Sequence, residues 1–419
     1  MLYQIYEINR SLMSPFVKWA KASSKLLTDP ISPFSHAPFA QPIAAGYELL
    51  YRLGKDYYKP FFGIESIESD FYHASIREDV VFHKSFCKLI HFKKGDIFFK
   101  TKKIIDQPIV LLVAPLSGHH ATLLRDTVKT LLIDYDVYVT DWIDARMIPL
   151  EAGTFHLEDY IFYIQDFIRY LGPKINVISV CQPTVPVLAA ISLMSSQDDP
   201  NMPSSMVMMG GPIDPRRSPT EVNDLALNKS FSWFEKNMIH KVPTNYPGFN
   251  RKVYPGFLQH MGFVAMNPKR HAESHWNFYL HLREGENAST EDHIKFYDEY
   301  NSVLDMPAEY YLDTIKTVFQ DFALPKGNWI VGGNLVRPKD IKKVSLFTIE
   351  GEFDDISGLG QTEAAHDLCT GLPNNMKFHF TAPKCGHYGI FSGRRWRELI
   401  SPKVSEFIKK FSSRTVKLE

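Results

Sequence analysis

A cysteine at a predicted strand–turn–helix junction has the clearest chemical potential in this chain. Residues 175–180 form a short apolar run typical of a strand, and a helix-like segment at 187–194 follows soon after Cys181. The N-terminus of a helix carries partial positive charge and free N–H groups, which favour a thiolate over a thiol. Cys181 is therefore a candidate nucleophile, and the alternative is that it is a small buried hydrophobic residue, as many free cysteines are.

The turn around Cys181 resembles the nucleophile elbow of α/β-hydrolases, whose pattern is G-x-S-x-G. Here the three key positions are Ser179, Cys181 and Pro183, so both glycines are missing. Ser179 is small enough for a tight turn, and Pro183 suits the first turn of a helix, where a backbone N–H has no partner. We expect the elbow geometry to survive, with the backbone N–H of Gln182 as one donor of an oxyanion hole.

A nucleophile of this kind needs a base and an orienting acid, which follow it in the order nucleophile, acid, histidine. Asp354 lies just after the predicted strand 344–349, at the strand end where open α/β sheets keep their sites. His387 lies in a glycine-flanked loop after the predicted strand 377–381. The order and placement of these residues predict a triad of Cys181, Asp354 and His387. Considered alone, any one of the 16 histidines could be a surface or core residue without a catalytic role.

Two other aspartates compete for the role of the acid. Asp214 follows the predicted strand 206–209, a place that some proteins of this fold use for the acid. We prefer Asp354, because Asp214 opens the next segment and suits a turn or a cap. Asp355 would point elsewhere if Asp354 faces His387, and we expect it to brace the loop.

The segment 114–120 supplies the second part of the predicted oxyanion hole. It follows the first central strand, where the fold provides an N–H donor, and we assign this role to the backbone of Leu116 and Ser117. The adjacent His119 and His120 suggest a metal site, but no third ligand lies at a suitable spacing, and His271 with His275 lies far along the chain. We predict neither a metal nor a cofactor.

Short apolar runs alternate with segments of helical spacing, which is typical of a parallel sheet covered on both faces. The clearest helix spans 157–171 and ends at Gly172. The fold class is therefore α/β, with a mostly parallel central sheet and helices on both faces. The predicted strands are 109–114, 137–140, 175–180, 206–209, 344–349 and 377–381.

The chain divides into an N-terminal extension, a core and an insert. Residues 1–80 mix aromatic residues with prolines and show only patches of helical spacing, and 87–92 with 96–100 suit a hairpin. The core comprises 81–211 and 341–419. Residues 212–340 are too long for one crossover and predict an inserted cap subdomain. Its many aromatic rings, such as Trp276 and Tyr279, either cover the site or form the core of the insert.

Composition indicates an ordinary globular protein without a strong charge preference. The 419 residues include 47 basic and 47 acidic side chains, so no net field attracts nucleic acid or an anionic membrane. The first ten residues contain Glu7 and Arg10 and lack the features of a secretion signal, and no apolar run reaches the ~20 residues of a membrane span. The four cysteines show neither zinc spacing nor a disulfide pattern. These features predict a cytoplasmic protein.

Several segments together resemble the intracellular poly(3-hydroxybutyrate) depolymerases, over almost the whole chain. The resemblance implies the α/β-hydrolase fold and a triad of Cys181, Asp354 and His387 that hydrolyses an amorphous storage polyester through a thioester, at granules in the cytoplasm. The segments that carry it are 1–4, 115–125, 141–146, 180–186, 351–358 and 384–393.

Three other functions compete with this expectation. A polyester synthase uses a similar triad, but its elbow normally reads G-x-C-x-G, which Ser179 and Pro183 do not match. A catalytically silent granule-binding protein would not need all three triad residues in order. A small-ester hydrolase or thioesterase is the third. Side-chain length of the polymer, product size, the choice between water and coenzyme A as acceptor, and oligomeric state are not determined by the sequence.

Overall fold

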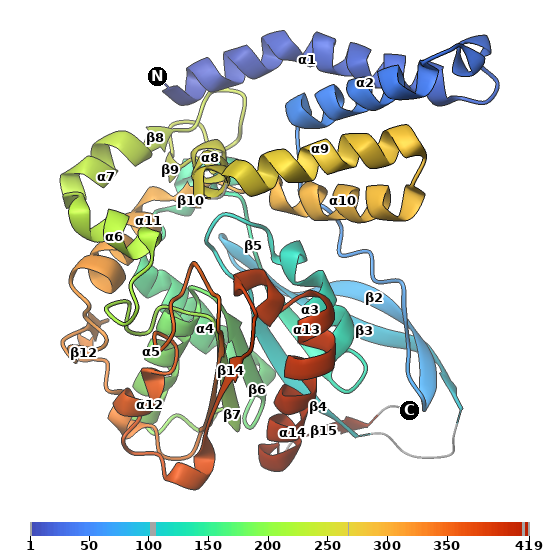
Figure 1. The fold of residues 1–419 in the computed structure, drawn as a ribbon. Coiled ribbons are helices and arrows are strands. Elements are labelled where there is room, and N and C mark those ends of the chain that lie inside the picture. Colours follow the sequence, from blue (N-terminus) through green and yellow to red (C-terminus); the bar gives the residue numbers. More distant parts are fainter. Residues whose placement is uncertain (1, 101–105, 267, 413–414, 418–419) are drawn as a thin grey trace.

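The computed structural model describes residues 2–100, 106–266, 268–412 and 415–417, and Met1, which belongs to the first resembling segment, lies outside them. Within these residues one large sheet has the strand order β1-β2-β3-β5-β4-β6-β7-β13-β14, with β15 beside β4. The strands from β5 to β14 run parallel, whereas β1, β2, β3 and β15 are antiparallel to their neighbours. This is the α/β-hydrolase fold (Figure 1).

The strands of the large sheet are short and their central members are completely buried, as a sheet covered on both faces requires. Their bounds are β1 Ser66–Glu68, β2 Tyr72–His83, β3 Cys87–Phe99, β4 Asp106–Val113, β5 Asp136–Trp142, β6 Asn176–Val180, β7 Ser205–Met209, β13 Ser345–Gly351, β14 Lys377–Ala382 and β15 Thr415–Lys417. All six predicted strands therefore exist and are consecutive neighbours in the sheet.

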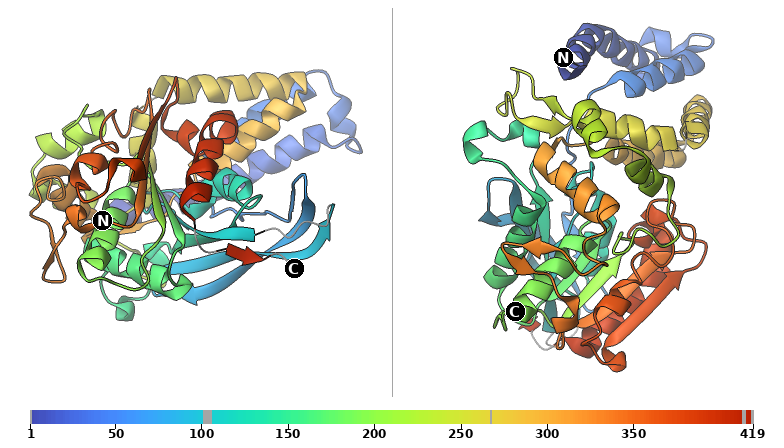
Figure 2. Two further views of the ribbon diagram at one scale, coloured as in Figure 1. Left: turned by 90° about the horizontal axis from the view of Figure 1, so that it is seen from below. Right: turned by 90° about the vertical axis from the view of Figure 1, so that its left-hand side faces the viewer.

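Helices cover the two faces of the sheet and create two apolar cores (Figure 2). One face carries α4 (Leu157–Leu171) and α5 (Thr184–Ser196), and the other carries α3 (Arg125–Leu131) and α14 (Ser401–Phe411). The apolar stripe of α4 is buried, and the helix ends at Gly172, whose φ of 83° requires glycine. The C-terminal part of the chain also contains two short helices, α12 (Ala365–Leu368) and α13 (Gly393–Arg395).

The N-terminal part of the sheet differs from its prediction. The predicted hairpin at 87–92 and 96–100 is wrong: 87–99 is one strand, β3, which pairs with β2 on one side and β5 on the other. The predicted boundary at residue 80 falls inside β2, so the sheet begins at Ser66. Long-range pairing extended β3 through Lys93-Lys94-Gly95, which by its residue types suits a turn.

The chain between the neighbouring strands β7 and β13 forms a largely helical insert over one end of the sheet (Figure 1). None of the helices among the described residues is long and apolar enough to cross a membrane. The elements of the insert are α6 Glu221–Asn228, α7 Phe231–Met238, β8 His240–Lys241, β9 Lys252–Tyr254, α8 Gly256–Met266, α9 Pro268–Glu284, α10 Asn287–Tyr300, β10 Met306–Pro307, α11 Ala308–Thr314, β11 Ile330–Val331 and β12 Asn334–Leu335.

Two helices precede the sheet and lie on top of the insert. These are α1 (Leu2–Thr28) and α2 (Ala40–Gly54), which pack side by side, with α2 against α9 (Figure 1). The side chain of Gln41 donates to the carbonyl of Leu282 at 2.8 Å, and Arg52 forms an ion pair with Asp298. The extension that was predicted to have only patches of helix is thus an ordered helical hairpin.

Candidate active site

Cys181 lies in a sharp turn between β6 and α5, and its backbone is in the left-handed region at φ 66°. This conformation is costly for a residue with a side chain, and it is typical of strained functional positions. The Cys181 N–H donates to the carbonyl of Met209 in the neighbouring strand at 2.7 Å. The predicted strand–turn–helix geometry is therefore present, although the flanking positions hold Ser179 and Pro183 instead of glycines.

Gly211, which follows the adjacent strand β7, allows two backbone segments to pack closely at this turn. A Cβ on Gly211 would lie 2.4 Å from the carbonyl oxygen of Cys181 and 1.8 Å from Oγ1 of Thr184. No other residue fits at 211 without moving this backbone. Thr362 holds the glycine in place, since its hydroxyl accepts from the Gly211 N–H and donates to the Gly211 carbonyl.

Asp354 and His387 meet at the ends of β13 and β14. The Nδ1 of His387 lies 2.8 Å from Oδ2 of Asp354, and both side chains are buried. The other carboxylate oxygen of Asp354 accepts from the backbone N–H groups of Ile356 and Ser357 at 2.9 and 2.8 Å. The acid is thus held by three hydrogen bonds and orients the imidazole with its second nitrogen free for another partner.

Cys181 lies close enough to His387 for its sulfur to influence the electrostatics of the imidazole. Burial lowers the pKa of His387, but the Asp354 carboxylate and the Cys181 sulfur together raise it well above its ordinary value. The site therefore favours a protonated imidazole beside the Asp354 carboxylate. This arrangement can hold an imidazolium–thiolate pair, the reactive form of a cysteine nucleophile.

Asp214 lies outside this arrangement. Its carboxylate accepts two hydrogen bonds from the guanidinium of Arg216, at 2.7 and 2.8 Å, and it also accepts from the Arg216 backbone. Burial raises the pKa of Asp214, but these contacts with Arg216 bring it below its usual range. Asp355, the other alternative, lies in the wall of a cavity next to His387.

The three residues expected to supply oxyanion donors follow the ends of the neighbouring strands β4 and β6. Leu116 and Gln182 are buried, and Ser117 is half-buried. Sequence reasoning missed Tyr310 of α11, whose hydroxyl donates to the side-chain carbonyl of Gln182 at 2.5 Å. The two residues are 128 positions apart, and nothing in the sequence links them. Tyr310 belongs to the insert, so the insert positions the residue that follows Cys181.

A cavity of 750 Å³ lies between the insert and the loops that carry Asp354 and His387. The rings of His387 and Tyr388 form its wall on the core side, and α9 and α10 form the opposite wall. Trp276 and Tyr279, which the sequence offered as substrate contacts, do not line it; Trp276 is exposed and stacks on Tyr279. The aromatic rings that line the cavity are Phe263, Phe278, Phe296, Tyr297, Tyr300, Phe353 and Tyr388.

Two of the histidines that suggested a metal have other partners, whereas the Nδ1 atoms of His120 and His275 are buried without a hydrogen-bond partner among the described residues. His119 contacts the carbonyl of Tyr300 at 3.1 Å and stacks on Phe263, while His271 contacts the hydroxyls of Tyr297 and Tyr300. Among the described residues, Glu350, Glu363 and His379 have metal-ligating atoms close together. The Glu350 carboxylate accepts from three backbone N–H groups, so it braces the loop 360–363.

Part of this chain matches a known protein family. Residues 210–412, just under half of the chain, match the family described as PHB de-polymerase C-terminus, where PHB is poly(3-hydroxybutyrate). This segment includes Asp354 and His387, whereas Cys181 precedes it. No curated protein sequence matches the chain.

Solved structures of similar fold include several hydrolases of low sequence identity. A 2-hydroxy-6-oxo-6-phenylhexa-2,4-dienoate hydrolase from Rhodococcus sp. strain RHA1 is 12% identical, with a TM-score of 0.44 over 80% of this chain and 99% of that one. An esterase from Thermogutta terrifontis is 12% identical, with a TM-score of 0.40 over 81% and 100%. A monoacylglycerol lipase from Paleococcus ferrophilus is 12% identical, with a TM-score of 0.43 over 74% and 98%.

Proposed function

We propose that this protein hydrolyses the ester bonds of an amorphous poly(3-hydroxybutyrate)-type storage polyester, with Cys181 as nucleophile, His387 as base and Asp354 as orienting acid. The observation that carries the proposal is the buried 2.8 Å hydrogen bond between His387 and Asp354, beside the elbow residue Cys181. The family match over 210–412 supports the polyester as substrate.

The proposed reaction has two halves. His387 takes the thiol proton of Cys181, and the sulfur attacks the ester carbonyl carbon. The carbon–oxygen ester bond breaks, His387 gives its proton to the leaving alcohol oxygen, and the acyl group stays on sulfur as a thioester. His387 then takes a proton from water, the resulting hydroxide attacks the thioester carbonyl, and the carbon–sulfur bond breaks. A free carboxylic acid leaves, and Cys181 regains a proton.

The negative charge on the carbonyl oxygen needs N–H donors in both halves. We assign this role to the backbone N–H groups near Leu116 and Ser117 and to that of Gln182, an effect of roughly 3–4 kcal/mol for one donor in comparable sites. The hydrogen bond from Tyr310 holds the Gln182 side chain and so fixes the residue that carries one donor. A single covered site of this kind suits one mobile polymer chain at a time.

The cavity beside His387 supports the amorphous form of the substrate. Its walls are rings and polar groups of α9, α10 and the 386–389 loop, so a chain segment must leave its neighbours to enter. Mobile chains of an amorphous granule can do this, whereas chains packed in a crystal cannot. We therefore propose a cytoplasmic protein that acts at polyester storage granules.

The test is a comparison of substrates with purified protein. Amorphous granules should be degraded readily and crystallised polymer little, with free 3-hydroxyacid or oligomers released in buffer without coenzyme A. Faster or equal attack on the crystalline form would contradict the covered site. A requirement for coenzyme A, or chain growth from a 3-hydroxyacyl thioester, would identify the synthase-like alternative. Binding without any turnover of granules or small esters would identify a silent granule protein.

A further inference from the structure

The long N-terminal helix α1 carries a continuous apolar stripe that faces solvent. The six residues that we call the outer stripe are each between 45% and 72% exposed, although each is a large apolar side chain. They recur at steps of three, four or seven residues, which is the spacing of one helix face. The outer stripe consists of Ile5, Ile8, Leu12, Phe16, Trp19 and Leu26.

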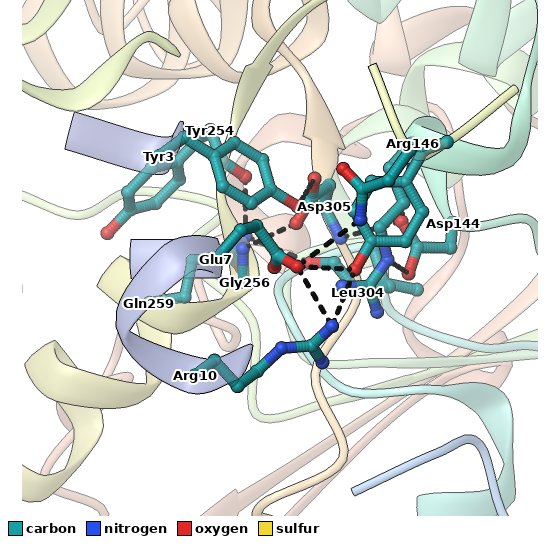
Figure 3. Close-up of polar contacts among 12 residues, drawn as sticks. Tyr3, Glu7, Arg10, Asp144, Arg146, Tyr254, Gly256, Gln259, Leu304 and Asp305 are labelled. Carbon is teal, nitrogen blue, oxygen red and sulfur yellow. Dashed lines mark hydrogen bonds and ion pairs between the residues drawn. The ribbon is translucent and has the colours of Figure 1, made fainter. Parts of the chain in front are cut away.

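The opposite side of α1 is polar and is bound to the rest of the molecule (Figure 3). The buried hydroxyl of Tyr3 donates to Oδ2 of Asp305 at 2.7 Å. Arg10 forms an ion pair with Glu7 at 2.8 Å and donates to the hydroxyl of Tyr246 at 3.1 Å. These contacts with the insert fix the rotation of α1 about its own axis.

The outer stripe and the charged residues of α1 lie on opposite halves of the helix. At 100° per residue the outer stripe lies within about 80° of arc, and all five charged residues of the helix lie on the other half. Those charged residues are Glu7, Arg10, Lys18, Lys21 and Lys25. Glu7 is buried, whereas Lys18, Lys21 and Lys25 are exposed, so the apolar stripe reaches solvent although the helix also exposes a charged side.

Further apolar side chains of the helical hairpin are exposed. Ile31 and Phe39 in the α1–α2 connection are largely exposed, and Ile43 and Leu50 of α2 are about half exposed. Large exposed apolar surface is rare on monomeric soluble proteins and marks a binding face.

The chemistry of the outer stripe selects among binding partners. A second copy of the chain pairing along α1 would need apolar residues at both repeat positions of a heptad. Ile5, Leu12, Trp19 and Leu26 fill one position, but Pro15 and Ala22 interrupt the other. An anionic lipid layer would favour cations beside the stripe, whereas the lysines of α1 lie on the other half. After these two partners are excluded, an uncharged apolar surface is the partner that fits the outer stripe.

We propose that the outer stripe docks the protein on the surface of the polyester itself. This inference rests on the proposed function, because it takes the substrate polymer as the occupant. The hairpin packs on α9, and residues of α9 line the cavity beside His387. Docking through α1 therefore keeps that cavity close to the polymer and raises the local concentration of chain segments.

The experiment compares two triple variants for binding to amorphous poly(3-hydroxybutyrate) particles. The stripe variant carries Ile8→Gln, Leu12→Gln and Phe16→Gln. The matched control carries Leu225→Gln, Leu227→Gln and Ile330→Gln, which are equally exposed apolar residues of the insert. Both are made in a Cys181→Ala background for co-sedimentation, so that the particles stay intact, and in the wild-type background for turnover.

The stripe variant should bind the particles at least about tenfold more weakly than the control, because transfer of apolar surface from water drives docking. In the wild-type background it should lose particle hydrolysis in proportion, while its kcat/KM on a soluble 3-hydroxybutyrate trimer stays within about twofold. Equal particle binding by the two triple variants overturns the proposal. If the stripe variant unfolds, the single variant Leu12→Gln, at the most exposed stripe position, decides by the same readouts.

Three further arms separate the remaining explanations. Tighter binding of the wild type to anionic phospholipid vesicles than to polyester overturns the choice of partner. A dimer in sedimentation velocity that only the stripe variant dissociates assigns the stripe to self-association and overturns docking. If neither trimer nor particles are hydrolysed by the wild type, the proposed function fails, while the loss of particle binding in the stripe variant still supports docking.

Discussion

The Nδ1 atom of His387 lies 2.8 Å from Oδ2 of Asp354, although 33 positions separate them in the chain. The two residues follow the neighbouring parallel strands β13 and β14, whose register brings both strand ends to the same edge of the sheet. Because both side chains are buried and the carboxylate is held by two further N–H groups, contacts within the chain fix the acid–base pair.

Replacing Cys181 by alanine should abolish polyester hydrolysis, with a loss of at least about a thousandfold in kcat and no loss of folding. Iodoacetamide should modify Cys181 first, because the thiols of Cys87, Cys369 and Cys385 are buried. The measurement is turnover on amorphous granules together with mass spectrometry of the alkylated protein. Cys369→Ala is the control, and near-wild-type activity of Cys181→Ala would refute the nucleophile assignment.

Asp354→Asn should lower turnover at least about a hundredfold, since it removes the negative charge that raises the pKa of His387. With a lower pKa the imidazole loses its proton near neutral pH, and the thiolate loses its cationic partner. Alkylation of Cys181 should therefore slow near pH 7, and its pH–rate profile should move to higher pH. Asp214→Asn is the matched control; a larger effect at 214 than at 354 would reverse the choice of acid.

Gly210→Ala should reduce kcat by at least about tenfold through displacement of the acid–base pair. An added Cβ would lie 3.0 Å from Cδ1 of Ile390, 3.3 Å from Oδ2 of Asp354 and 3.4 Å from Cε1 of His387, so Ile390 and the Asp354 carboxylate would have to shift. The φ of 57° also favours glycine. Gly333→Ala is a control for the strain alone, since its φ is 75° and its Cβ would meet no atom within 4 Å. The control should lose about 1–2 kcal/mol of stability and no activity; equal kinetics in both variants would refute the steric argument.

Asp305→Asn should change how stability depends on pH. Burial, with the neighbouring Asp144 carboxylate, raises the pKa of Asp305 from 3.8 to about 7. Between these values the native protein keeps a proton that the unfolded chain has lost, so the free energy of unfolding falls as the pH rises.

Asparagine cannot titrate, and it keeps polar partners for Tyr3 and the Gly256 N–H. The fall in unfolding free energy from about pH 4 to about pH 7 should therefore be smaller in Asp305→Asn than in the wild type. Denaturant titrations at several pH values measure it, with the exposed Asp321→Asn as control. An unchanged slope in Asp305→Asn would mean that this carboxyl is already ionised in the folded protein.

The elements that carry Cys181, Asp354 and His387 could be predicted because their signals are local. Short runs of buried apolar residues define β6, β13 and β14, and each candidate follows the end of its strand. The order nucleophile, acid, histidine then restricts the choice of residues before any contact is known. The strand β3 was predicted wrongly because its length depends on pairing with β2. Most of β2 was assigned to the N-terminal segment 1–80 and was not predicted as a strand.

The sequence alone determined the class of fold and the three candidate residues, since strand length, apolar spacing and residue order are properties of nearby positions. Only the tertiary structure decided that His387 meets Asp354, because this hydrogen bond joins the ends of two strands that are 33 positions apart. Asp214 is instead paired with Arg216, two positions along the chain. The tertiary structure also decided that Tyr310 of the insert holds Gln182, and that α1 leaves its apolar stripe exposed while Glu7 and Arg10 contact the insert. A helical repeat predicts that a helix has two faces, but which face meets solvent depends on the partners that the fold brings to it.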